Sequence, residues 1–164
     1  AGGADGSAFS LLTENDASTG GRWAGMAQYL DTRCIEEGFT YTFEAKIKLT
    51  QSDGTPFVCN MDGSSNDPNS CATASLRSRN ALTESEWDWR IVASMQENDQ
   101  VWNSLTGTFS MSSFDASASH SVVYISGVPA GVDIQLDQVS LVRTSPSDAP
   151  SDAPSDAPSD APSD

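Results

Sequence analysis

The sequence predicts an all-β protein, a two-sheet antiparallel jelly-roll β-sandwich that occupies residues 1–143. Three observations predict this fold class. Several short segments alternate apolar and polar residues with the period of two expected for a strand that faces a core on one side. Turn-forming residues separate these segments at regular intervals. Only two segments, near residue 115 and at 83–86, have the composition of a helical turn.

The clearest strand prediction is the segment from Tyr41 to Leu49, in which aromatic and aliphatic residues occupy the odd positions. Glu44 and Lys46 lie on its outward side. A turn over 52–56 follows, and residues 57–61 are expected to return antiparallel. Further strands are expected at 9–12, 26–30, 87–94, 105–111, 121–126 and 130–142.

The last predicted strand contains a break in its alternation. Val132, Ile134 and Leu136 form one apolar face, but Val139 and Leu141 continue on the opposite parity. This offset predicts a β-bulge near Asp137 and Gln138. Residues 144–164 then repeat Pro, Ser, Ala and Asp, with no side chain that could hold a core, so we expect a disordered acidic linker that acts as an extended spacer.

Charge and composition exclude several classes of function. The formal net charge is −15, and the domain without the linker keeps −10 with scattered basic residues, which argues against nucleic acid or an anionic membrane as a partner. No apolar run is long enough to span a bilayer. The single histidine, His120, is expected in a solvated loop, and the acid pairs Glu36–Glu37 and Glu84–Glu86 lie in polar connections. We therefore expect no catalysis by this segment.

Cys59 and Cys71 bracket a loop of Asn, Asp, Ser and Gly that has no core of its own. A disulfide between them would close this loop and implies an oxidising compartment, so the expected location is extracellular or in the cell wall. The alternative is three buried free thiols. With the disulfide formed, Cys34 is unpaired or is paired outside this segment.

Four motifs occur in an order that resembles a known family. They are Trp23 and Gly25; Gly38, Tyr41, Phe43 and Ala45; Trp102, Leu105, Gly107 and Phe109; and Asp137, Val139, Ser140 and Leu141. This order, which covers most of residues 9–142, is similar to that of the carbohydrate-binding modules of families 4, 9, 16 and 22. Those modules are two-sheet jelly rolls that accompany cellulases, xylanases and laminarinases.

The resemblance also implies that the first strand of the family fold is missing. These modules begin with a strand that has no counterpart before Gly6, so we expect a sandwich that lacks its first strand and has one uncovered edge. The family places a structural calcium ion between that strand and an Asp that matches Asp137, and a carboxylate at a bulge suits calcium. The alternative is a solvated or hydrogen-bonded carboxylate.

A sugar ring offers an apolar face of C–H groups and a rim of hydroxyls, so its binding site needs flat aromatic rings beside polar side chains. The resemblance places Tyr124 at the family cleft, and Glu44 and Lys46 lie on the outward face of the long strand. Gln135, on the polar face of the last strand, could bind a hydroxyl or simply face solvent. Three positions depart from the family: Lys46 where Trp is frequent, Ser126 where Glu is frequent, and Asn15 where Arg is frequent.

Trp87, Trp89 and Arg90 place two rings and a planar cation within four residues, which makes them candidates for sugar binding. If Ile91 and Ala93 share the face of the tryptophans, however, the pattern favours a core position for both rings. Asp88 and Arg90 would then face the ligand.

These observations predict a monomeric, non-catalytic module that binds a polysaccharide, β-glucan or a related cell-wall glycan. The C-terminal linker would tether it to a secreted glycoside hydrolase or a cell-wall protein. The alternative is a structural or adhesive extracellular jelly roll that does not bind sugar.

Overall fold

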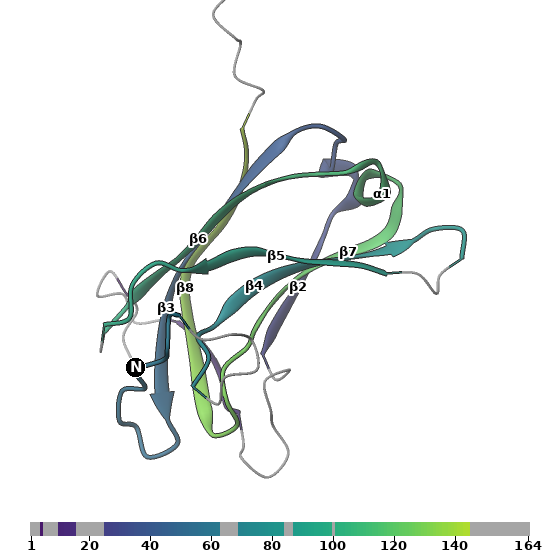
Figure 1. Ribbon diagram of the computed structural model, residues 1–164. Helices are drawn as coiled ribbons and strands as arrows, with labels where there is room; N and C mark the ends of the chain where they lie inside the picture. Colours follow the sequence, from purple (N-terminus) through teal and green to yellow (C-terminus); the bar gives the residue numbers. More distant parts are fainter. Residues whose placement is uncertain are drawn as a thin grey trace, which may run out of the picture.

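The computed structural model describes residues 4, 10–15, 25–62, 69–83, 87–99 and 101–144. Within these residues, eight antiparallel strands form one sheet in the order β1-β8-β3-β6-β5-β4-β7-β2 (Figure 1). The strands are β1 (Leu11–Thr13), β2 (Met26–Leu30), β3 (Thr40–Gln51), β4 (Thr73–Asn80), β5 (Trp87–Met95), β6 (Asn103–Ser110), β7 (Ala118–Ser126) and β8 (Val132–Thr144). A 3-10 helix, η1 (Thr32–Cys34), and a short helix, α1 (Ser113–Ala116), complete the described elements.

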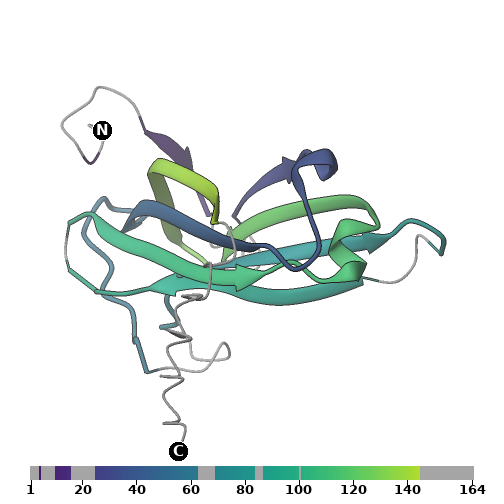
Figure 2. The same ribbon diagram turned by 90° about the horizontal axis from the view of Figure 1, so that it is seen from above.

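The sheet curls into two layers, which confirms the predicted jelly-roll sandwich. One layer is β1-β8-β3-β6 and the other is β5-β4-β7-β2. The layers are continuous at one corner, where β5 pairs with β6 only through Ser94–Thr106 and Met95–Leu105. The edge strands β1 and β2 lie on the same side of the molecule (Figure 2). Between these strands runs an apolar groove of about 370 Å³, lined in part by Leu11, Met26 and Val139.

The core lies between the layers and follows the predicted alternation. The five odd-numbered side chains of β3, from Tyr41 to Leu49, are each at most 5% exposed. Leu76 of β4, Leu105 of β6 and Ile134 of β8 are fully buried opposite or beside them. The regular alternation of β3 is thus explained by its position in the middle of its layer, between β8 and β6.

The predicted bulge is present in β8. Glu44 lies opposite Ser140 and Lys46 opposite Asp137, so the two residues between Asp137 and Ser140 face only one residue of β3. Gln138 has a φ of 50°, the left-handed conformation that an inserted residue adopts to re-aim the strand. The change of parity in the sequence therefore has a structural cause.

A second bulge lies in β5 and was not predicted. Ala74 of β4 faces Ala93, but Ser75 faces Ile91, so Val92 is an extra residue. Gly107 of β6 packs against this bulge, because a Cβ atom there would lie 2.1 Å from the Val92 carbonyl oxygen. Only glycine leaves room for the two backbones to approach at the corner between the layers.

Several predictions about local structure can be checked directly. Cys59 and Cys71 form the predicted disulfide, and Cys34 is free and exposed. The helical turn near residue 115 is α1. The prediction of a strand at 57–61 is wrong, because this segment forms only an isolated bridge. The sequence analysis did not predict β4.

Some predictions fall on residues outside the described part of the chain. They concern the missing first strand, Phe9, Trp23, residues 84–86 and the linker from residue 145, while Thr144 still belongs to β8. In the described residues, no helix combines the length and apolar character needed to cross a membrane.

Candidate functional site

The outward side of the layer β5-β4-β7-β2 carries most of the exposed aromatic side chains. The strand register places Arg77 between Trp89 and Val122, and Arg79 between Trp87 and His120. Tyr124 lies between Ser75 and Ala27. We call this surface the aromatic face; its outward positions are Trp87, Trp89 and Ile91 of β5, Thr73, Ser75, Arg77 and Arg79 of β4, His120, Val122, Tyr124 and Ser126 of β7, and Ala27 and Tyr29 of β2.

Trp87, Trp89 and Ile91 form an exposed row along β5, with 44%, 48% and 47% of their surface accessible. The prediction of a core position for the two tryptophans is therefore wrong. It assumed that Ile91 and Ala93 share a face, but the Val92 bulge separates them and places Ala93 in the core. A one-residue offset exchanges the two faces of a strand.

Trp87 is held by two guanidinium groups. The Cζ atom of Arg77 lies 5.2 Å from the centre of the Trp87 ring, and that of Arg79 lies 5.6 Å away. Both distances fall within the range of a cation–π interaction. The ring is thus fixed in place without being buried, and it stays exposed on the aromatic face.

The other aromatic residues of this face lie on β7 and β2. Tyr124 is half-buried, and burial raises the pKa of its hydroxyl although the nearby charge of Arg77 opposes this shift. Tyr29 contacts the His120 ring edge-on, with the ring centres 6.4 Å apart. His120 belongs to β7, so the expected loop position is wrong, although its exposure agrees with that prediction.

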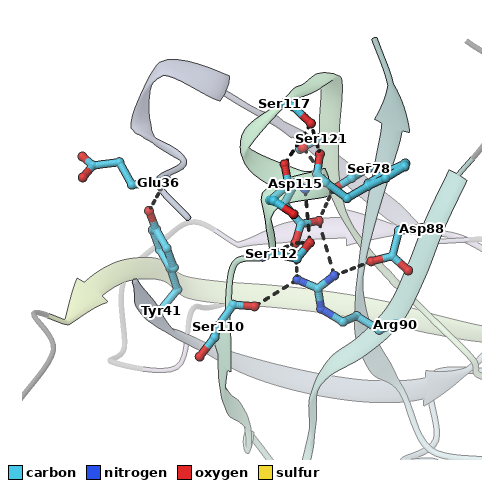
Figure 3. A network of polar contacts seen from close by, with 12 residues as sticks. Glu36, Tyr41, Ser78, Asp88, Arg90, Ser110, Ser112, Asp115, Ser117 and Ser121 are labelled. Atoms are coloured by element: carbon cyan, nitrogen blue, oxygen red, sulfur yellow. Dashed lines mark hydrogen bonds and ion pairs between the residues drawn. The ribbon is translucent and has the colours of Figure 1, made fainter. Parts of the chain in front are cut away.

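Arg90 points away from the aromatic face and does not join Trp87 and Trp89 there. Its guanidinium donates to Asp88 Oδ2 and to Asp115 Oδ2, each at 2.6 Å, and to the Ser110 carbonyl oxygen at 3.1 Å (Figure 3). Asp115 lies in α1 and is fully buried. Arg90 therefore ties β5 to α1 and to the end of β6 at one end of the sandwich.

Asp115 is the buried centre of this network. Its carboxylate also accepts hydrogen bonds from Ser78 Oγ at 2.6 Å and from the Ser112 amide and hydroxyl at 2.8 and 2.7 Å. Burial alone would raise the pKa of Asp115, but the hydrogen bonds from Arg90, Ser78 and Ser112 together hold that pKa below its ordinary value. The network is therefore structural, with its anion kept charged.

The fold is similar to the folds of solved carbohydrate-binding modules. A family 22 module of Xyn10C from Paenibacillus barcinonensis, described as a xylan-binding domain, superimposes with a TM-score of 0.60 at 13% identity over 82% of this chain and 78% of that chain. The other family 22 module of that protein gives 0.54 at 17% identity, over 84% and 73%.

An N-terminal part of the endo-1,4-β-D-xylanase 10B of Clostridium thermocellum, solved with xylohexaose and containing family 22 and family 10 hydrolase modules, gives 0.58 at 16% identity over 87% of this chain. This chain spans only 23% of that one. The chain has the fold of a family 22 carbohydrate-binding module. No family model and no curated protein matches the sequence.

Within this carbohydrate-binding-module fold, Glu44 and Lys46 lie on the opposite layer from the tryptophans. They line a hollow of about 250 Å³ on the outward side of β3 and β6, where Lys46 Nζ donates to Ser104 Oγ at 2.8 Å. Among the described residues, no tryptophan or tyrosine lines this hollow. These two predicted residues therefore do not join Trp87, Trp89 and Tyr124.

Gln135 also stays apart from the aromatic face. It pairs with Lys48 of β3 and Leu12 of β1 and is only 9% exposed. Its Oε1 atom has no hydrogen-bond partner among the described residues. Gln135 is thus neither a solvent-facing residue nor a neighbour of the sugar-binding candidates on β5 and β7.

Asp137, the predicted calcium ligand, lies at the bulge of β8. Its carboxylate accepts the Ala4 amide at 2.7 Å and the Gln138 amide at 2.8 Å. Calcium needs six to eight oxygen ligands, and no group of three or more His, Cys, Asp or Glu side chains that could hold a metal occurs in the described part of the chain. Asp137 is thus the one carboxylate here that would hold calcium, and the ion stays a prediction of the sequence.

Arg77, Arg79 and Tyr29 are the residues of the aromatic face that the sequence analysis missed. The signal for the two arginines was present, because they alternate with Ala74, Leu76 and Ser78 in a strand pattern. It was weak because only Leu76 among these inward residues is large and apolar.

Proposed function

We propose that this chain is a non-catalytic polysaccharide-binding module whose ligand lies on the aromatic face. The observation that carries the proposal is the exposed row of Trp87 and Trp89 on β5, on the same face as Tyr124 of β7. Leaving two indole rings in water forgoes roughly 2 kcal/mol of burial free energy for each ring. A contiguous exposed aromatic surface of this kind marks a binding site.

The geometry suits a sugar polymer. Trp87 and Trp89 are two residues apart on one strand, so their side chains lie on the same face at a separation of roughly 7 Å along the strand. Rings spaced in this way can each stack on the C–H face of a sugar, while Arg77 and the Tyr124 hydroxyl offer hydrogen bonds to its rim. The ligand would then extend along the strand direction of β5 and β4.

We further propose that the polymer is a β-glucan or a related cell-wall glycan. The module would be monomeric, located outside the cell or in the cell wall, and tethered by its linker to a glycoside hydrolase or a cell-wall protein. The Cys59–Cys71 disulfide supports an oxidising compartment. The neighbours that carry xylan-binding in their names support a cell-wall glycan as the ligand, and the one that is joined to a hydrolase module supports the tether to a glycoside hydrolase.

The test is affinity electrophoresis of the folded protein in gels that contain laminarin, xylan, cellulose derivatives or mannan. The Trp89→Ala variant is expected to lose about 30-fold in affinity, corresponding to roughly 2 kcal/mol for a central aromatic contact. Two variants on the opposite layer serve as controls. Val142→Ala removes an exposed apolar side chain, and Lys46→Trp restores the aromatic residue frequent in the family; both are expected to change affinity less than about twofold.

Two results would contradict this assignment. If Lys46→Trp raises the affinity strongly while Trp89→Ala has no effect, the ligand lies on the outward side of β3 instead. If the folded protein is retarded by none of the polysaccharides, the chain is a structural or adhesive jelly roll, the second function that its sequence allows.

A further inference from the structure

The aromatic face concentrates positive charge in a strongly acidic protein. The chain has 23 acidic and 8 basic residues, yet Arg77 and Arg79 both occupy outward positions of this face. Among the outward positions described on its four strands, none is an Asp or a Glu. The sequence predicted scattered basic residues, but the fold gathers two of them beside the tryptophans.

Arg77 differs from other arginines of the protein in its partners. Arg33, Arg90 and Arg143 each form an ion pair with a carboxylate. No carboxylate of the described residues pairs with Arg77, which is exposed and has its Cζ atom over the Trp87 ring. The N–H groups of a guanidinium match two oxygens of a carboxylate or a sulfate.

We propose that the ligand of this face is an anionic polysaccharide, whose carboxylate or sulfate groups pair with Arg77 while its sugar rings stack on Trp87 and Trp89. This inference rests on the proposed function and specifies its substrate class.

The register supports this arrangement. Arg77 lies beside Trp89 and Arg79 beside Trp87, so each ring has a cation on the neighbouring strand. A polymer extended along these strands meets both rings and, next to Trp89, the exposed guanidinium of Arg77. Since the net charge of −15 repels polyanions in general, such a ligand is held by these short-range pairs and not by the overall field.

The test compares matched polymers that differ only in charge. Carboxymethyl cellulose is compared with hydroxyethyl cellulose, and dextran sulfate with dextran, by titration calorimetry on the full chain. At least one anionic polymer is expected to bind about tenfold more tightly than its neutral partner at about 20 mM salt, and this ratio should fall towards one at about 500 mM. Binding of only the first anionic polymer identifies carboxylate as the group recognised, and binding of only the second identifies sulfate.

Arg77→Gln is the decisive variant, and Arg33→Gln is its matched control. Both remove one exposed arginine, but Arg33 lies in η1 and already pairs with Asp31. Arg77→Gln is expected to remove most of the preference for the charged polymer, whereas Arg33→Gln should retain it, with circular dichroism used to verify folding. Equal losses in the two variants, or equal affinity of the wild type for charged and neutral polymers, would overturn the inference and leave the proposed function standing. Absence of binding to every polymer would overturn both.

Discussion

The two outward faces of the sandwich arise from the same strand alternation but carry different side chains. The outward side of β3 and β6 presents Thr42, Glu44, Lys46, Ser104 and Thr106, small or charged groups that water solvates well. The aromatic face presents indole rings and guanidinium groups instead. Because folding requires only that inward residues be apolar, the composition of an outward face reflects what it contacts in solution. The difference therefore supports the proposal that the ligand lies on the layer of β5, β4, β7 and β2.

Replacing Arg90 with Gln has the largest expected effect, because it leaves buried Asp115 without its cation. Loss of one partner of a buried ion pair costs about 3–5 kcal/mol of unfolding free energy. The matched change on the other layer, Arg143→Gln, breaks the exposed pair with Glu36 and should cost less than about 1 kcal/mol. Urea unfolding of both variants at neutral pH measures this difference, and similar losses would contradict it.

The difference in unfolding free energy between the wild type and Arg90→Gln is also expected to depend on pH. The folded pKa of Asp115 lies below its ordinary value, so its contribution to stability is present above about pH 4 and is lost as the pH falls through the folded pKa. The gap in stability between the wild type and Arg90→Gln should therefore narrow in acid. A gap that stays constant down to about pH 2 would show that the cost of the variant does not arise from the Asp115 charge.

Gly107→Ala tests the corner that joins the two layers. The new methyl group would collide with the Val92 carbonyl oxygen and the Ala93 Cα atom, so the backbone must move. We expect a loss of about 1–3 kcal/mol in urea unfolding. Thr108→Ala, one position further along β6 and exposed, should change stability by less than about 0.5 kcal/mol. Equal stabilities of the two variants would mean that β5 and β6 are not in close contact.

Gln138→Gly has the smallest expected effect, and it should raise the unfolding free energy where the other variants lower it. Gln138 has a φ of 50°, where a side chain is strained and glycine is not. Relief of this strain, offset by the greater freedom of unfolded glycine, should raise the unfolding free energy by up to about 1 kcal/mol. Val139→Gly, at the next position of β8, should lower it. A loss of stability in Gln138→Gly would mean that the Gln138 side chain contributes to the hollow on the outward side of β3.

The sequence predicted the features that depend on regular patterns. The alternation of β3, the bulge at Asp137 and Gln138, and the Cys59–Cys71 disulfide are all confirmed. The orientation of Trp87 and Trp89 could not be predicted, because it depends on the bulge at Val92. That bulge becomes visible only when β4 is paired with β5.

Only part of the candidate site could be predicted, because the pairing of the strands is not visible in the sequence. Trp87, Trp89 and Tyr124 share one face, whereas Glu44, Lys46 and Gln135 belong to the other layer. Sequence alternation identifies the outward residues of each strand but does not identify the strands that are neighbours. The prediction therefore combined polar residues from two layers into one site.

The hydrogen bond from Arg90 to the Ser110 carbonyl oxygen has a consequence for self-association. In the described part of β5, residues 87–93 pair with β4 on one side only, so the backbone edge beside the tryptophans is free of strand partners. Exposed edges next to apolar side chains recruit strands from other molecules and start aggregation. The guanidinium occupies a carbonyl acceptor on the adjacent strand and brings a charged group to this edge. This charged group therefore opposes the pairing of a strand from a second molecule with the edge beside the two exposed tryptophans.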